Sequence, residues 1–173
     1  TSVEYGTTKQ VTHTPEAERG LSFGADNRSL VYSSERNGKR DLYIAKISRK
    51  EDLNFPNATL IEEEPLIHDK KLERDYPQFS PDGKVVAFIE DRNRLMVVNL
   101  DTKKIRQVTD GSTWYTRSGG FDYSWSPDGK WFTLEFIGNK HDPYSDIGLV
   151  SADGKGQIIN LTNSGYTSGS PRW

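Results

Sequence analysis

The sequence contains no cysteine and only three histidines among its 173 residues. Disulfides and thiolate metal sites are therefore excluded, and a cysteine-free chain suits the cytosol and the periplasm alike. No apolar run reaches about 18 residues, the length that a membrane-spanning helix requires. We therefore expect no membrane span. Residues 1–11 show no secretory leader and are typical of the interior of a longer protein.

Charge of one sign is not in excess, because 23 Lys and Arg stand against 25 Asp and Glu. Surfaces that bind nucleic acid carry a basic excess, so no nucleic acid partner is expected. Hydrophobic residues make up 33% of the chain, yet aromatic residues make up 11%. A disordered chain would lack these aromatics, whereas several small β units with thin cores would have this composition.

One motif recurs along the chain: an aromatic residue, a Ser-Pro-Asp-Gly turn and an apolar run. Complete copies lie at 79–88 and 125–134, and a degenerate copy lies at 23–32. The anchoring aromatics are about 50 residues apart, close to the period of β-propeller blades. They are Phe23, Phe79, Trp125 and Trp173.

The chemistry of the turn explains the motif. Proline presets φ at the first turn position, aspartate caps nearby amides, and glycine supplies a positive φ. Asn27 takes the glycine position in the degenerate copy, and asparagine is the next-best residue for positive φ. The turn residues to which we assign this structural role are Pro81, Asp82, Gly83, Pro127, Asp128 and Gly129.

The strand pattern predicts an all-β fold, a β-propeller fragment of three four-stranded blades plus partial blades at both ends. A β-sandwich is the alternative. The predicted boundaries are 1–12 for the end of a preceding blade, 15–62, 76–110 and 121–162 for the three blades, and 166–173 for the start of a following blade. Blade faces left uncovered at the two ends predict self-association, centred on Trp125, Trp131 and Trp173.

The two Ser-Pro-Asp-Gly turns and the segment 34–43 resemble the TolB-type propeller repeat, and the resemblance covers nearly the whole chain. The chain as a whole most resembles the N-terminal propeller of tricorn-like serine peptidases. In that family, such blades precede separate PDZ and catalytic modules. This implies a non-catalytic module that docks or gates peptide substrates or partner domains. A TolB-like envelope scaffold that binds other proteins is the alternative, and prolyl-oligopeptidase propellers and propeller sugar lyases are further ones. The resemblance favours a periplasmic or envelope location over a cytoplasmic one.

No catalytic, metal-binding or cofactor-binding residue is predicted. A nucleophile elbow is absent, and Ser80 and Ser126 each precede a proline inside a turn. The three histidines are interpreted as solvated loop residues: His13, His68 and His141. The group His141, Asp142 and Asp146 has the spacing of neither a zinc site nor a calcium loop.

Two segments are candidate contact regions for peptides, proteins or other domains of the parent chain. Trp114, Tyr115 and Arg117 lie on a predicted loop at one rim, and aromatic and arginine side chains are enriched in binding hot spots. Packing between adjacent blades is the alternative for this segment. The charged stretch 62–75 is interpreted as a solvated connection held by one apolar contact, with a docking loop as the alternative.

Overall fold

The computed structural model describes residues 8–67, 71–112, 114, 120–138 and 143–173. The chain divides into two units, residues 1–79 and 80–173. Within the described ranges, no helix is long and apolar enough to cross a membrane. The regular structure is almost entirely β, with one short 3-10 helix at Phe55–Asn57.

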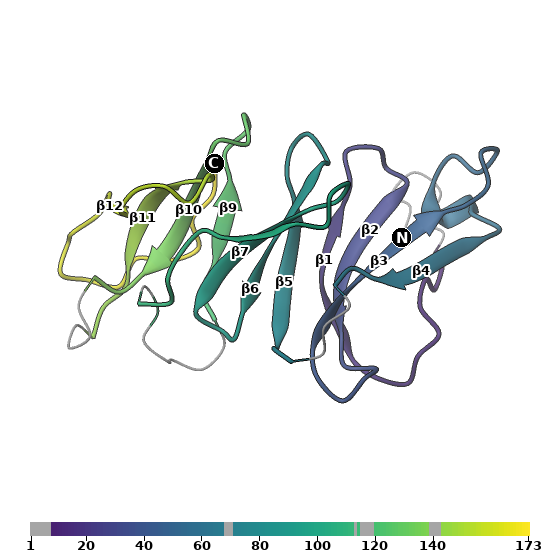
Figure 1. Ribbon diagram of the computed structural model, residues 1–173, viewed down its shortest axis with the longest axis horizontal. Helices are drawn as coiled ribbons and strands as arrows, with labels where there is room; N and C mark the ends of the chain where they lie inside the picture. Colours follow the sequence, from purple (N-terminus) through teal and green to yellow (C-terminus); the bar gives the residue numbers. More distant parts are fainter. Residues whose placement is uncertain (1–7, 68–70, 113, 115–119, 139–142) are drawn as a thin grey trace. The chain divides into compact units, whose positions relative to one another are not determined.

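Three four-stranded antiparallel sheets follow one another along the chain (Figure 1). Neighbouring strands in each sheet are consecutive in sequence, which is the meander of a propeller blade rather than the crossed connections of a sandwich. The predicted fold class is therefore confirmed. The strands are β1 (Glu18–Phe23), β2 (Ser29–Ser34), β3 (Asp41–Ile47) and β4 (Ile61–Pro65); β5 (Arg74–Phe79), β6 (Val85–Glu90), β7 (Arg94–Asn99) and β8 (Ile105–Gln107); β9 (Tyr123–Trp125), β10 (Trp131–Phe136), β11 (Asp146–Ser151) and β12 (Ile159–Asn160).

The second unit is built around one apolar core to which β6, β7 and the third sheet all contribute. Phe132 lies at its centre with no exposed surface, and its ring centroid is 4.0 Å from that of Trp125 and 5.9 Å from that of Tyr123. Alternate residues of each strand enter this core, as expected of pleated strands that bury one face against a neighbouring sheet.

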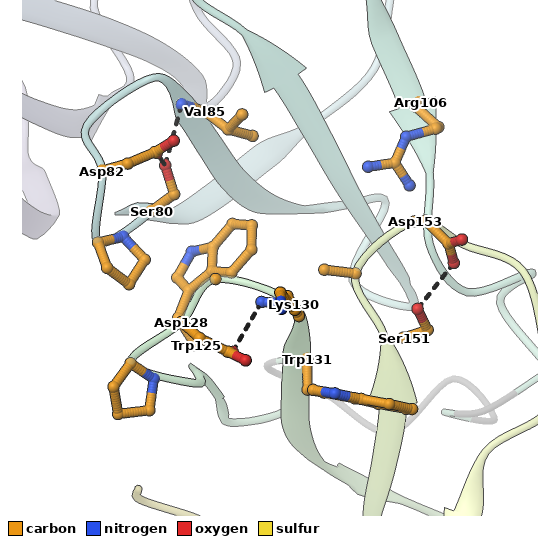
Figure 2. Close-up of a pocket in the computed structure, with 14 residues that line it drawn as sticks. Ser80, Asp82, Val85, Arg106, Trp125, Asp128, Lys130, Trp131, Ser151 and Asp153 are labelled. Atoms are coloured by element: carbon orange, nitrogen blue, oxygen red, sulfur yellow. Dashed lines mark hydrogen bonds between the residues drawn. The ribbon is translucent and has the colours of Figure 1, made fainter.

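Each complete Ser-Pro-Asp-Gly turn is closed by the same set of side-chain bonds, and Figure 2 shows those made by Ser80. The Ser80 hydroxyl donates to Asp82 Oδ1 at 2.6 Å and accepts the Val85 amide at 3.0 Å. Ser126 makes the same bonds with Asp128 and the Trp131 amide, at 2.6 and 2.9 Å. The turns are therefore held by contacts within five residues of sequence.

The glycine of this turn has the positive φ that the motif predicts: 70° at Gly83 and 69° at Gly129, with Asn27 at 55° in the degenerate copy. We expect Gly129→Val to reduce the free energy of unfolding by about 1–3 kcal/mol, because a β-branched residue is strained there. Gly129→Asn is the matched control and should lose under about 1 kcal/mol. Urea denaturation measures both, and equal losses would contradict the role given to φ.

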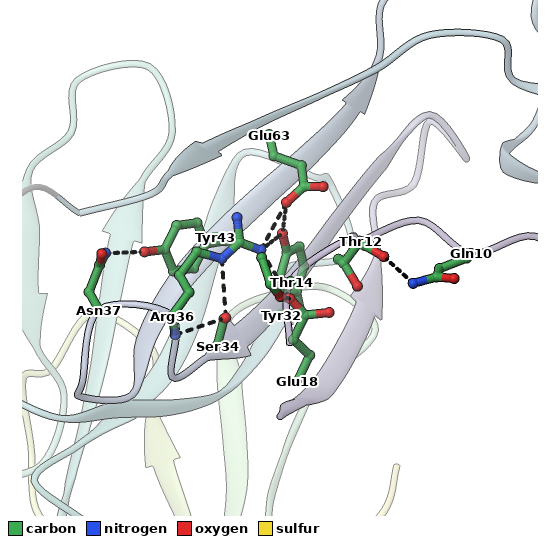
Figure 3. Close-up of polar contacts among 10 residues, drawn as sticks. All are labelled: Gln10, Thr12, Thr14, Glu18, Tyr32, Ser34, Arg36, Asn37, Tyr43 and Glu63. Carbon is green, nitrogen blue, oxygen red and sulfur yellow. Dashed lines mark hydrogen bonds and ion pairs between the residues drawn. The ribbon is translucent and has the colours of Figure 1, made fainter. Parts of the chain in front are cut away.

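In the first unit, Arg36 ties the sheet together on one face (Figure 3). Its guanidinium lies 4.1 Å from the ring centroid of Tyr43 on β3. It also pairs with Glu18 on β1 at 3.0 Å and with Glu63 on β4 at 2.9 Å. Tyr32 on β2 donates to the same Glu63 at 2.5 Å. Burial is the main cause that raises the pKa of Tyr32, and this bond is the second. Arg36 also donates to the Tyr32 hydroxyl at 2.7 Å, so this arginine contacts side chains from all four strands of the sheet.

The interpretation of residues 62–75 as a solvated connection is wrong at both ends. Glu62, Glu63 and Glu64 belong to β4, and β5 begins at Arg74. Arg74 is 1% exposed and Asp75 is 7% exposed. Arg74 pairs with Asp41 of β3 at 3.2 Å, and Asp75 pairs with Arg40, which directly precedes β3, at 2.5 Å. These ion pairs allow the charges to be buried, since a buried charge is tolerated only with a partner.

The predicted partial blades remain predictions. Residues 8–17 form no strand, and residues 1–7 lie outside the described ranges. The segment 166–173 also forms no strand, but its Ser168 amide donates to the Ser145 carbonyl at 2.7 Å. The Arg74 amide of β5 bonds the Arg40 carbonyl at the corresponding place in the first unit. The two bonds occupy equivalent places in the repeat, but a following blade stays a prediction because the final segment forms no strand.

Candidate functional site

Of the predicted rim residues, the structure places Trp114 in the core of the second unit. It is 7% exposed, and its ring centroid lies 5.9 Å from that of Phe121. Its indole Nε1 is buried without a hydrogen-bond partner in the described part of the chain. Tyr115 and Arg117 lie outside the described residues. Trp114 is therefore an anchor for this segment, and binding by the segment stays a prediction.

The histidines and the group around Asp146, to which the sequence assigns no catalytic or metal-binding role, lie only partly within the described residues. His13 is exposed, whereas His68, His141 and Asp142 lie outside the described residues. The carboxylate of Asp146 accepts the Asn160 amide and the Thr162 hydroxyl, both at 2.8 Å. These bonds join β11 to the chain around β12, so Asp146 has a structural role.

The aspartates of the two complete turns have pKa values below their ordinary value. A hydrogen bond from Ser80, followed by one from the Lys84 amide, lowers the pKa of Asp82. A bond from Ser126, followed by one from the Lys130 amide, lowers the pKa of Asp128. Both aspartates are therefore ionised at neutral pH. Their serines are engaged within the turn and are not placed as nucleophiles.

Acid is expected to destabilise the second unit through these turns. The pKa values of Asp82 and Asp128 lie below the unfolded value of about 4, so their ionised forms add stability above that pH. This contribution is lost as the pH falls through the folded pKa. Replacing Ser80 and Ser126 with alanine should therefore weaken the fold at pH 7 more than at pH 3. Urea denaturation midpoints of the wild type and the variant at the two pH values test this. An equal loss of stability at pH 7 and pH 3 would contradict it.

Sequence reasoning missed a polar cluster at the start of β5. Asp75 accepts the Ser33 hydroxyl at 2.6 Å, the Arg40 guanidinium at 2.5 Å and the Tyr76 amide at 2.9 Å. Tyr76 has a φ of 54°, which is unusual for a bulky residue. Asp75 stabilises this conformation by accepting the Tyr76 amide. No local signal predicts the cluster, because Ser33 lies 42 residues and Arg40 lies 35 residues from Asp75 in the sequence.

A cleft of about 730 Å³ opens in the second unit beside the two complete turns (Figure 2). This volume falls within the usual range of ligand pockets, about 300–1,000 Å³. The residues that line it are Ser80, Pro81, Asp82, Val85, Arg106, Trp125, Pro127, Asp128, Gly129, Lys130, Trp131, Ser151, Ala152 and Asp153. Sequence reasoning assigned the turn residues to structure alone and did not predict the cleft.

Large apolar side chains are exposed at the positions expected to drive self-association. Trp131 is 37% exposed and Trp173 is 55% exposed, while Trp125 is half-buried against Phe132. We expect the isolated chain to self-associate as its concentration rises, because packing these indoles against a second copy would remove apolar surface from water. Light scattering across a concentration series tests this. A constant monomer mass up to millimolar concentration would contradict it.

Comparisons with known proteins support the fold. No family model matches the chain. Over 153 residues it is 24% identical to the Tol-Pal system protein TolB of Francisella tularensis subsp. tularensis, covering 84% of this chain and 31% of the relative. The structure of TolB from Acinetobacter baumannii has a TM-score of 0.70 at 20% identity, covering 95% of this chain and 37% of that one. Tricorn protease has a TM-score of 0.58 at 17% identity, covering 87% and 13%.

The chain thus spans about a third of the length of the TolB proteins that it matches. The tricorn likeness is the weaker of the two, so the expectation of a tricorn-like propeller as the best match is corrected. The repeat resemblance to TolB is confirmed at the level of the fold. The chain is a stretch of TolB-like β-propeller containing three complete sheets.

Proposed function

We propose that this chain is part of a TolB-like scaffold that binds other proteins. The observation that carries the proposal is the likeness to TolB over 95% of the chain at a TM-score of 0.70. The likeness to tricorn protease is lower in both coverage and score. The turn serines, which are bonded within their own turns, add no nucleophile that would favour a peptidase role.

The relatives are named as Tol-Pal system proteins, and we propose that the partners of this chain belong to the same system. This role would place the protein in the periplasm or cell envelope. The predicted rim segment is the proposed contact region. Trp114 would hold it against Phe121, and Tyr115 and Arg117 would contact the partner.

Biolayer interferometry between the immobilised chain and each soluble Tol-Pal protein of its own organism tests the proposal. We expect one of them to bind, and Tyr115→Ala with Arg117→Ala to weaken binding by about tenfold or more. Lys9→Ala, in the first unit, is the control and should leave binding unchanged. Absence of binding to every Tol-Pal protein would overturn the proposal. Capture of unrelated unfolded peptides, with cleavage by the full-length protein, would favour the peptidase module instead.

A further inference from the structure

The cleft beside the two turns has an apolar floor and walls from several parts of the second unit. Trp125 of β9, Val85 of β6 and the rings of Pro81 and Pro127 supply apolar surface. Trp131 adds an indole that is 37% exposed. In Figure 2, Trp125 lies toward the turns that carry Asp82 and Asp128, and Arg106 and Asp153 lie at the other end of the cleft. An extended apolar segment could therefore lie across it.

The walls of the cleft are rigid before anything binds. Three of its aspartates accept a serine hydroxyl and a backbone amide through the same Oδ1 atom. Asp82 does so at 2.6 and 3.1 Å, Asp128 at 2.6 and 3.0 Å, and Asp153 at 2.8 and 2.9 Å. A preformed site loses little conformational freedom on binding, which favours affinity. These carboxylates are mainly committed to the turns that shape the cleft.

Both acceptors and donors face the cleft. The turn bonds of Asp82, Asp128 and Asp153 use only Oδ1, which leaves their Oδ2 atoms as acceptors, and three donor groups are also open. In the described part of the chain, no hydrogen bond or ion pair is recorded for the Trp131 indole N–H, the Lys130 ammonium or the Arg106 guanidinium. Hydrogen bonds from the Lys155 amide and the Ser151 hydroxyl lower the pKa of Asp153, and the charge of Arg106 adds a smaller effect. This carboxylate therefore balances part of the charge of Arg106. A ligand that suits this surface presents apolar rings to Trp125 and Trp131 and carbonyl acceptors to the three donor groups.

A proline-containing segment in the polyproline II conformation has these properties. Proline has no N–H, and the carbonyls of this helix make no internal hydrogen bonds, so they are free to accept. Grooves lined by aromatic residues bind such segments because the ligand is already extended and loses little entropy. We propose that this cleft binds an extended, proline-rich segment of another polypeptide. This inference rests on the proposed protein-binding function but assigns no role to residues 114–117.

The role of each side chain follows from its place. Trp131 would pack against a proline ring and donate its indole N–H to a ligand carbonyl. Arg106 and Lys130 would donate to further carbonyls along the segment. Trp125 would form the floor, and its contact with Phe132 fixes its position.

Fluorescence anisotropy with a labelled ten-residue oligoproline peptide tests the inference, at a protein concentration where light scattering reports monomer. We expect saturable binding with a sub-millimolar dissociation constant. Trp131→Ala should weaken it by about tenfold and Arg106→Ala by about threefold, since a tenfold change corresponds to about 1.4 kcal/mol. Trp173→Ala is the matched control, because Trp173 is 55% exposed and does not line the cleft. Circular dichroism confirms that each variant is folded.

Two comparison peptides make the result decisive. A Gly-Ser peptide of equal length has free amides and no apolar rings, and a glutamate-rich peptide tests attraction by Arg106 and Lys130 alone. Failure of oligoproline to bind the folded chain, or equal binding of the Gly-Ser peptide, overturns the inference. Preference for the glutamate-rich peptide also overturns it. Retained binding of a Tol-Pal protein in that event would leave the proposed function standing, so the two failures are distinguishable.

Discussion

Replacing Asp41 with alanine is expected to destabilise the first unit by about 3–5 kcal/mol, because it removes a partner of a buried charge. Arg74 is 1% exposed, and its guanidinium lies 3.2 Å from Asp41. Asp41 also accepts the Leu42 amide at 2.9 Å, so the substitution removes a second bond. Urea denaturation monitored by circular dichroism measures the loss.

The double variant Asp41→Ala/Arg74→Met separates the charge effect from the loss of packing. Replacing both members of a buried ion pair by uncharged groups is often close to neutral. The double variant should therefore be more stable than Asp41→Ala alone. A double variant that is as unstable as the sum of the two single variants would show that the pair does not couple, and would contradict this account.

Phe132→Ala is expected to cost about 3–5 kcal/mol, because it leaves a cavity at the centre of the second unit. Phe132 has no exposed surface and packs against both Trp125 and Tyr123. Since Trp125 forms the floor of the proposed peptide cleft, this variant should also weaken oligoproline binding. Thermal denaturation and the anisotropy assay measure the two effects.

Ile159→Ala is the matched control for Phe132→Ala. Ile159 lies on the short strand β12 and is 53% exposed, so its truncation removes little buried surface. Surface substitutions of this kind usually change stability by less than about 0.5 kcal/mol. Similar losses for the two variants would indicate that the core is not centred on Phe132.

Much of the fold could be predicted because the signals are local. The apolar runs of β6 and β10 follow the turns directly, and the sheets form between consecutive strands. The candidate site was harder to predict from the sequence than the fold. Tryptophan is a residue type common in binding sites, yet Trp114 is buried against Phe121. Residue type alone does not distinguish a contact residue from an anchor, because both are large and aromatic.

The same backbone conformation recurs at Tyr76 and Ser170, but the carboxylate that stabilises it comes from different places in the sequence. Asp75 accepts the amide of Tyr76, and the corresponding positions near the chain end are Gly169 and Ser170. Ser170 has the same φ of 54° as Tyr76, and its amide is accepted by Glu135 of β10 at 2.6 Å. A side chain at Gly169 would meet Glu135, since an added Cβ would lie 2.6 Å from its Oε1. The same carboxylate function thus comes from a different strand.

The sequence by itself determined the all-β class, the spacing of the blades and the geometry of the turns. Those features depend on residues within about five positions of one another, as in the bonds of Ser80 with Asp82 and Val85. Only the tertiary structure decided that Arg36 bridges four strands, that Arg74 is buried and that the two turns border a cleft. The physical reason is that a charged side chain is stable in the interior only beside its partner. Arg74 and its partner Asp41 are 33 residues apart in the sequence, so no local pattern predicts that they meet.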